Sequence, residues 1–178
     1  MDIPKYIYDR YNQRYTVEVE EDSELSFYIK LKDRETYIGQ MLVGFLPAGV
    51  MILEDLYIHS GLDAPEKWTP GRKTGGVASL LPSLKMSAGL KGKRKAGIEI
   101  TNYRNRGLGS ALVRILFKLA ADRKGTVIFG SLIKADIVIN PRLLAWYINR
   151  GFTESGPFPA CIPDAETYIR YDVPSAQS

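Results

Sequence analysis

A glycine-containing turn at the start of the longest amphipathic helical pattern constrains the fold of this chain most strongly. Residues 104–109 read RNRGLG and separate an apolar strand pattern from that helical pattern. Glycine lets the backbone come close to a ligand, and the free N–H groups and positive dipole end of a helix start attract anions. The turn therefore predicts a phosphate or pyrophosphate site, although a tight turn that needs glycine only for its backbone is the alternative interpretation.

The helix after this turn and the elements that follow it are predicted from periodicity. The helix begins at Gly107 with apolar residues at helical spacing (Leu108, Ala111, Leu112, Ile115, Leu116 and Leu119) and ends at Gly125. A strand is expected over 126–133. A second helix, PRLLAWYINR, is expected to begin with Asn140 as its N-cap and Pro141 in its first turn, and to end at Gly151. Residues 152–155 and 167–173 are expected to be closing strands.

The first third of the chain carries alternating or apolar β-strand patterns. Strands are predicted over 14–20, 25–31, 37–45 and 50–58, joined by short connections as in an antiparallel meander. Residues 59–95 are rich in Gly and Pro and predict a long loop with one helical turn near 77–86, followed by a short strand at 97–101. The order predicts an α+β fold: a mostly antiparallel sheet with helices packed on it.

Composition limits the classes of protein. The chain has 178 residues, a length that suits one domain spanning residues 1–178, and a net charge of +4, which permits an anionic partner. It has one cysteine (Cys161) and one histidine (His59), so we expect neither a disulfide nor a metal site. No signal segment or membrane-length apolar run is found, which predicts a cytoplasmic protein without a membrane partner.

Two separated motifs resemble those of the GNAT (GCN5-related N-acetyltransferase) superfamily, whose members move an acyl group from coenzyme A to an amine. The first is Arg104, Gly107 and Gly109 in the turn. The second is NPRLLAWYINRGF over 140–152, with Asn140, Tyr147 and the terminal Gly-Phe. The resemblance covers about residues 97–173. It departs from the family at Leu143, where a small residue is common, and in the first third, where the family has helices and this sequence predicts strands.

The resemblance implies an acetyl-coenzyme A (acetyl-CoA) co-substrate and no metal. The pyrophosphate would lie on the turn, and the pantetheine arm would pair with the strand at Ile100 and Thr101. Asn140 would hold the arm, cap its helix, or do both. The cofactor-binding residues implied are Ile100, Thr101, Arg104, Asn105, Arg106, Gly107, Leu108, Gly109, Ser110 and Asn140.

Tyr147 is the predicted general acid. A phenol with a pKa of about 10 is protonated at neutral pH and can give its proton to a departing thiolate. The alternative is a tyrosine packed in the core beside Trp146. An alkyl amine must lose a proton before it attacks, and Glu99 is the first candidate for the base, followed by Glu54 and Asp55 on the neighbouring strand and by His59.

The sequence thus predicts an N-acetyltransferase that transfers the acetyl group directly to a primary amine in a ternary complex. A non-catalytic acyl-CoA-binding or sensing protein is the rival. The basic residues of Lys91–Lys95 favour a plain surface loop; the alternatives are a loop that covers the acceptor cleft or the phosphates of coenzyme A, or one that attracts an anionic acceptor. The absence of a strong aromatic and basic motif argues against a nucleic-acid partner. The acceptor amine is left open, and the closing strands could pair across a homodimer.

Overall fold

The computed structural model describes residues 3–59, 102–158, 162 and 165–174. In them, the chain forms one eight-stranded sheet with the order β1-β2-β3-β4-β5-β6-β8-β7. The strands are β1 (Tyr6–Tyr8), β2 (Arg14–Ser23), β3 (Ser26–Asp33), β4 (Thr36–Leu46), β5 (Val50–Ile58), β6 (Val127–Leu132), β7 (Thr153–Ser155) and β8 (Thr167–Asp172). Every neighbouring pair is antiparallel except β5 and β6. The mostly antiparallel α+β fold predicted from the sequence is confirmed.

The first half of the sheet is a meander, as alternation in the sequence predicts. β2 to β5 follow one another through short turns, and a one-turn 3₁₀ helix, η1 (Pro47–Gly49), joins β4 to β5. Alternate residues of β3 point into the core, where Phe27, Ile29 and Leu31 are buried. The short strand β1 was not predicted.

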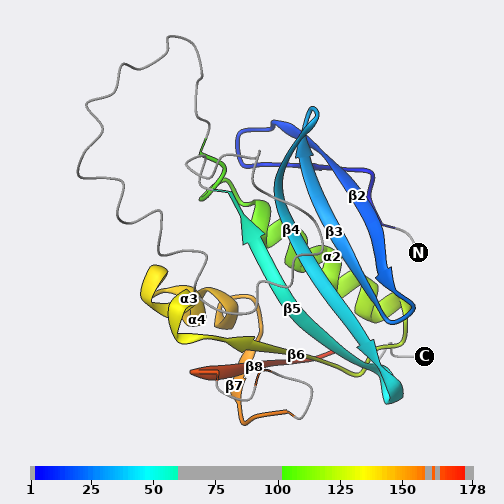
Figure 1. The fold of residues 1–178 in the computed structure, drawn as a ribbon, viewed down its shortest axis with the longest axis vertical. Coiled ribbons are helices and arrows are strands. Elements are labelled where there is room, and N and C mark those ends of the chain that lie inside the picture. The colour runs from blue at the N-terminus through cyan, green and yellow to red at the C-terminus, as the bar shows by residue number, and fades with distance from the viewer. Residues whose placement is uncertain (1–2, 60–101, 159–161, 163–164, 175–178) are drawn as a thin grey trace.

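The helix α2 (Leu108–Asp122) covers one face of this meander and lies behind it in Figure 1. Its buried residues recur at helical spacing and include the apolar positions predicted from the sequence: Leu108, Ala111, Leu112, Val113, Ile115, Leu116, Leu119 and Ala120. They pack on the inward side chains of β2 to β5 in one core cluster. The predicted helix and its glycine start are confirmed.

The predicted second helix is wrong in its start. The structure has two short helices, α3 (Lys134–Ile139) and α4 (Leu143–Ile148). Asn140 is the C-cap of α3, and the Asn140 carbonyl accepts a hydrogen bond from the amide of Leu143 (2.9 Å). The N-cap of α4 is Arg142. Asparagine suits either helix end and proline often follows a C-cap, so the pair Asn140–Pro141 did not distinguish the two.

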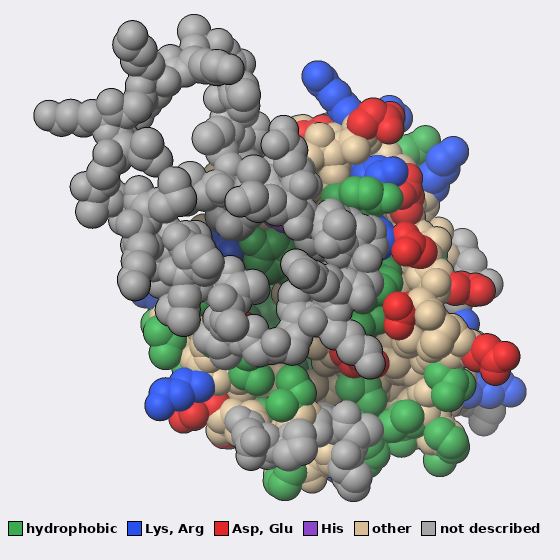
Figure 2. Space-filling view, viewed as in Figure 1, with side chains coloured by type: hydrophobic (Ala, Val, Ile, Leu, Met, Phe, Trp, Pro, Cys, Tyr) green, Lys and Arg blue, Asp and Glu red, His purple; other side chains and the backbone are tan. Residues whose placement is uncertain are grey.

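The predicted loop over 59–95, the helical turn near 77–86 and the strand at 97–101 lie outside the described residues, apart from His59, which is buried. Hydrophobic, acidic and basic side chains all occur on the face opposite α2, which Figure 2 shows. Each helix in the described part of the chain is too short or too polar to cross a lipid bilayer.

Candidate functional site

The glycine turn has the backbone of an open anion cradle. Gly107 is the N-cap of α2 and takes a left-handed conformation (φ 87°), as does Asn105 (φ 59°). A β-carbon built on Gly107 would meet no atom of the described residues within 4 Å. A left-handed residue directly before a helix turns successive N–H groups toward one concavity, which suits an anion.

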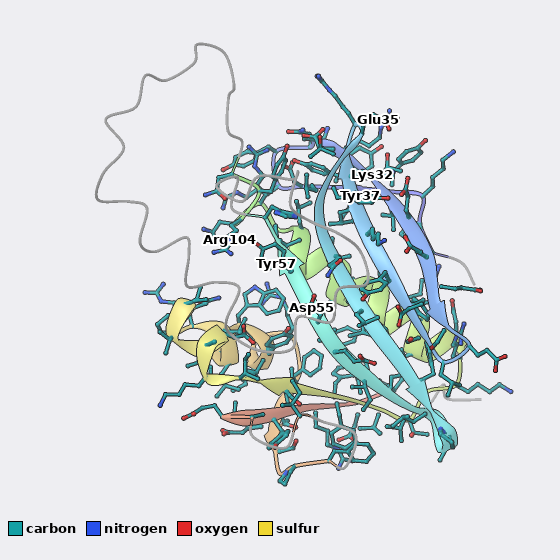
Figure 3. The ribbon with its side chains drawn as sticks, in the orientation of Figure 1. Lys32, Glu35, Tyr37, Asp55, Tyr57 and Arg104 are labelled. Atoms are coloured by element: carbon teal, nitrogen blue, oxygen red, sulfur yellow. The ribbon has the colours of Figure 1, made fainter. Side chains whose placement is uncertain are left out.

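The two arginines of the turn have different surroundings. Arg104 is exposed at the end of β5, where its Nε donates to the carbonyl of Ile58 (3.2 Å) and its guanidinium lies 5.9 Å from the centre of the Tyr57 ring. Figure 3 shows Arg104 and Tyr57 together at this end of the sheet. Arg104 therefore keeps an exposed cation at the mouth of the turn.

Arg106 instead points toward the N-terminal strands. Its Nη1 donates to Asp9 Oδ2 (3.4 Å), Gln13 Oε1 (3.1 Å) and Tyr15 Oη (3.3 Å), and its Nε donates to the carbonyl of Asn102 (3.0 Å). The Asp9 side chain is fully buried. The Arg106 side chain therefore holds the turn in place, and only the Arg106 backbone amide is positioned to bind an anion.

The first turn of α2 meets α4 at Gly109 and Ser110. A β-carbon on Gly109 would lie 3.2 Å from Cζ2 of Trp146, so glycine lets the Trp146 ring pack closely on the first turn of α2. Ser110 Oγ accepts hydrogen bonds from Arg150, whose guanidinium also donates to the carbonyl of Trp146 (2.6 Å) and stacks on its ring at 3.6 Å. Arg150 therefore adds a half-buried cation beside the helix start. Sequence reasoning missed this residue, although it directly precedes the Gly-Phe pair of the second motif.

β5 and β6 separate beside this helix start. Their parallel pairing covers Val50–Leu53 and Val127–Gly130 and ends there. In Figure 1 the two strands then diverge, and α3 and α4 lie on the side toward which they open. The sequence predicted that the strand at 97–101, with Ile100 and Thr101, would lie here; those residues are outside the described part, and the strand that the structure places beside β6 is β5.

β5 carries a carboxylate where it leaves β6. Asp55 follows a bulge at which the register with β4 shifts, and Gln40 Nε2 donates to Asp55 Oδ2 (2.9 Å). The surrounding protein displaces water from the Asp55 carboxyl and so raises its pKa, although the residue is partly exposed to solvent. The hydrogen bond from Gln40 acts in the opposite direction and lowers this pKa. Gln40 Oε1 is buried and accepts no hydrogen bond from the described residues. Asp55 and Tyr57, two positions apart, lie along β5 between the strand separation and Arg104 (Figure 3).

Tyr147 lies in α4 with its ring buried in an aromatic cluster. Its ring centre is 4.8 Å from that of Trp146 and 5.3 Å from that of Phe152, both edge-on, so the packing role weighed from the sequence is real. Burial raises the pKa of Tyr147, the negative charges of Asp55 and Asp136 raise it further, and Arg150 lowers it. The phenol is therefore protonated at neutral pH and close enough to both carboxylates to be affected by their charges.

The structure brings together most of the predicted site residues that it describes. Leu108 is buried under the helix start, while Asn105, Gly107, Gly109 and Ser110 form its rim. Asn140 Oδ1 accepts from the amide of Arg142 (3.3 Å), a local turn contact. Glu99, Ile100 and Thr101 lie outside the described residues. Sequence reasoning missed Gln40 and Asp136 because a cross-strand hydrogen bond and a charge on an unpredicted helix leave no local pattern.

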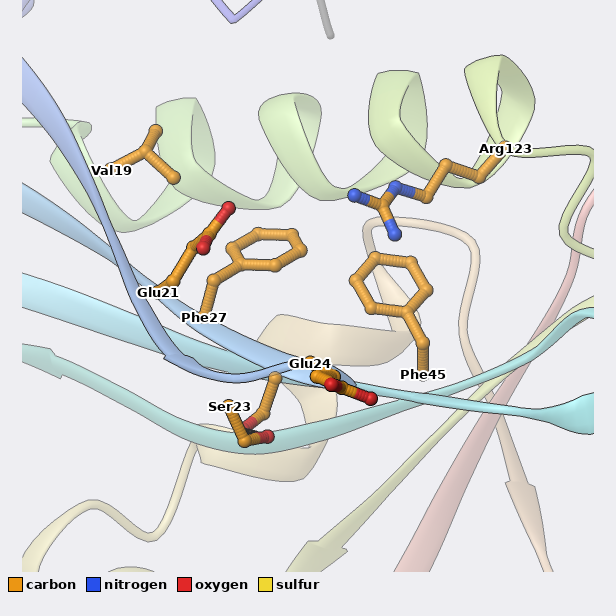
Figure 4. A pocket seen from close by; sticks show the side chains of 8 residues that line it. Val19, Glu21, Ser23, Glu24, Phe27, Phe45 and Arg123 are labelled. Carbon is orange, nitrogen blue, oxygen red and sulfur yellow. Dashed lines mark hydrogen bonds between the residues drawn. The ribbon is translucent and has the colours of Figure 1, made fainter.

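A small pocket lies at the C-terminal end of α2, away from the glycine turn. It holds about 100 Å³ and is lined by Phe27, Phe45 and Arg123 with Glu21 and Glu24 at its edge (Figure 4). The Arg123 guanidinium lies 4.1 Å from the centre of the Phe45 ring. This cation covers the end of the core, and the pocket lies at the opposite end of the helix from the glycine turn.

Among the described residues, no group of three or more His, Cys, Asp or Glu side chains is placed to bind a metal ion.

Comparisons with known proteins agree on the fold. No family model matches the chain, and no curated protein matches it. Solved structures do. A Klebsiella pneumoniae protein named as an acyl-CoA N-acyltransferase superposes with a TM-score of 0.56 at 11% identity, over 89% of this chain and 97% of that one. A GNAT-family acetyltransferase of Staphylococcus aureus gives a TM-score of 0.52 at 12% identity (84% and 68% covered). The Escherichia coli ribosomal-protein-S18-alanine N-acetyltransferase gives 0.51 at 12% identity (87% and 74% covered).

Proposed function

We propose that this chain, which has the fold of the GNAT acetyltransferases, transfers an acetyl group from acetyl-CoA to a primary amine. The observation that supports this most directly is the strand separation after Leu53 and Gly130. An anion cradle lies near one end of the opened β5, and an acid and a base lie beside the opening. A molecule with phosphates at one end and a thioester at the other suits this arrangement.

The cradle would hold the pyrophosphate through the backbone amides of residues 105–110. Arg104 and Arg150 supply positive charge beside them. Beyond Leu53, β5 has no pairing with β6, so backbone groups of Leu56 and Tyr57 could pair with the pantetheine arm as an added strand. Asn140 remains a candidate contact for the arm, as do Ile100 and Thr101.

The reaction needs one base and one acid. The base first takes one proton from the ammonium form of the amine and releases it to solvent. The neutral amine nitrogen then attacks the thioester carbonyl carbon and gives a second proton to the base. The carbon–sulfur bond then breaks, and the departing thiolate takes a proton from the Tyr147 hydroxyl. The products are an N-acetyl amide and coenzyme A, and the proton held by the base returns to Tyr147 through solvent.

We favour Asp55 as the base among the described residues. It lies at the strand separation, its raised pKa brings it closer to neutral pH, and it lies near enough to Tyr147 to influence the phenol. Glu99, the first candidate from the sequence, stays a prediction. His59 is buried, and its ring packs edge-on against Tyr57 at 5.0 Å, which leaves it a weaker candidate.

A two-stage experiment tests the proposal. The first stage measures binding of acetyl-CoA by calorimetry. The second measures thiol release with a panel of alkyl amines, polyamines, aminoglycosides and peptides with free N-termini. Binding with thiol release supports the enzyme, whereas binding without release for every acceptor favours the non-catalytic sensor. No binding at all would reject both.

A further inference from the structure

A pocket on the sheet face opposite α2 opens where β5 and β6 separate. It has a volume of about 440 Å³, within the range of small-molecule sites. Leu53 and Gly130 form the last pair between the two strands, and the next residue of each strand, Glu54 and Ser131, lines the pocket. The pocket therefore borders the point at which the proposed thioester would be exposed to an acceptor.

The pocket is apolar except for one carboxylate and a few hydroxyls. Its apolar wall comes from the ends of β4 and β5 and two nearby loops: Leu25, Phe45, Leu46, Ile52, Leu53 and Ile162. Glu54 is the one charged side chain among its described lining residues. Among the described residues, no ion pair uses Glu54.

Glu54 and Asp55 face the same side of the sheet. Gln40 and Gly44 are four positions apart on β4 and so lie on one face. Gln40 bonds to Asp55, and a β-carbon on Gly44 would lie 2.6 Å from Glu54 Oε1. The bulge between Leu53 and Asp55 explains how two consecutive side chains share a face. Glycine at position 44 leaves the room in which the Glu54 carboxylate lies.

We infer that this pocket takes the acceptor, and that the acceptor is a primary monoamine carried on an apolar body. Glu54 pairs with the incoming ammonium group, the apolar wall holds the body, and Asp55 removes the proton. A polyamine would place its second ammonium against apolar wall, and a peptide would bury amide groups there without hydrogen-bond partners, so both fit less well. This inference rests on the proposed acetyl transfer.

The test measures steady-state acetylation at saturating acetyl-CoA. The acceptors are butylamine, hexylamine, phenylethylamine, spermidine and a tripeptide with a free N-terminus. For wild type, we expect kcat/KM to rise by about 4-fold for each methylene that the pocket accepts, and spermidine and the tripeptide to fall below phenylethylamine. Glu54→Gln should raise the amine KM at least 10-fold and leave kcat within about 3-fold, since one ion pair in a partly dry site is lost.

Two further variants separate the role of Glu54 from general damage. Gly44→Ala keeps the carboxylate but displaces it, so it should raise the amine KM in the same direction, and adding it to Glu54→Gln should change little more. Glu35→Gln, the same substitution in the turn between β3 and β4, should leave KM unchanged. The inference is overturned if Glu54→Gln leaves the amine KM unaltered or lowers kcat alone, or if spermidine or the tripeptide is the best acceptor. Wild type that binds acetyl-CoA and acetylates no amine would reject the proposed function instead.

Discussion

Tyr147 combines a packing role with a proposed chemical one, and a single substitution separates them. Tyr147→Phe keeps the ring between Trp146 and Phe152 and removes only the hydroxyl. We expect kcat to fall by about 10²–10⁴-fold because the thiolate loses its proton donor, while the Kd of coenzyme A and the melting temperature change little. Steady-state kinetics measures kcat, titration calorimetry the Kd of coenzyme A, and thermal unfolding the melting temperature. A turnover equal to that of wild type would remove Tyr147 from the mechanism.

The pH dependence of the reaction tests Asp55 as the base. A base works when it is unprotonated, so kcat/KM should rise with pH through the raised pKa of Asp55. The hydrogen bond from Gln40 lowers that pKa, so Gln40→Leu should shift the rise to higher pH, and Asp55→Asn should abolish it with a large loss of rate. The amine also titrates, and repeating the profile with two amines of different pKa separates its contribution. If Gln40→Leu left the profile in place, Asp55 would not be the titrating group.

At the scale of elements, the glycine turn depends on residues far away in the sequence. Asp9 and Gln13 of the loop between β1 and β2, with Tyr15 at the start of β2, hold the Arg106 side chain, and the amide of Arg10 donates to the Arg106 carbonyl (3.0 Å). Burial pushes the pKa of Asp9 up, but hydrogen bonds from the amides of Gln13 and Tyr11 and from the side chains of Tyr15 and Arg106 outweigh it and lower that pKa. Burial raises the pKa of Tyr15 to about 12, which keeps its hydroxyl a donor to Asp9.

Asp9→Asn should therefore destabilise the fold and loosen the turn. At pH 7 we expect a loss of about 1–3 kcal/mol in the free energy of unfolding, because hydrogen bonds to a buried charge are lost. Since the folded-state pKa of Asp9 is lowered, its ionised form stabilises the fold above the unfolded pKa. The difference between wild type and variant should shrink as pH falls through the folded pKa. Urea unfolding across this range measures it, with Asp172→Asn, in an exposed pair with Arg170, as the control. A difference that did not vary with pH would contradict the argument.

The elements that the sequence predicted are those with local signals. Alternation in β2 to β5 and the spacing of apolar residues in α2 depend only on neighbours along the chain. The roles of the charged residues depend on tertiary pairing, which has no local pattern. Arg106 resembled a phosphate ligand until Asp9, 97 residues away, was seen to hold it. Likewise, alternation in the sequence does not show which apolar strand pairs with β6. On sequence alone, Glu99 therefore comes ahead of Asp55 as the candidate base, whereas the structure pairs β5, which carries Asp55, with β6.

At the scale of the whole molecule, the separation of β5 from β6 is bridged by helices. α4 contacts the first turn of α2 through Trp146 at Gly109 and through Arg150 at Ser110, and its Phe152 end packs on α2 and β8 through Phe117 and Tyr171. The turn motif and the second motif are thus parts of one surface. This explains why two short patterns, each weak alone, together predicted the fold.

Gly109→Val tests this bridge together with the proposed ligand. The valine β-carbon would lie 3.2 Å from the Trp146 ring, so that ring must move away from the helix start, and we expect this overpacking to cost about 1–3 kcal/mol in stability. A ligand at 100 times its Kd should stabilise wild type by about 2.7 kcal/mol, and the variant should gain much less from the same coenzyme A concentration because the cradle and the bridge share one helix turn. Gly156→Val, where a β-carbon meets no atom of the described residues within 4 Å, is the matched control and should gain as much as wild type. Thermal unfolding with and without coenzyme A measures all three, and equal stabilisation of Gly109→Val and wild type would place the nucleotide away from this turn.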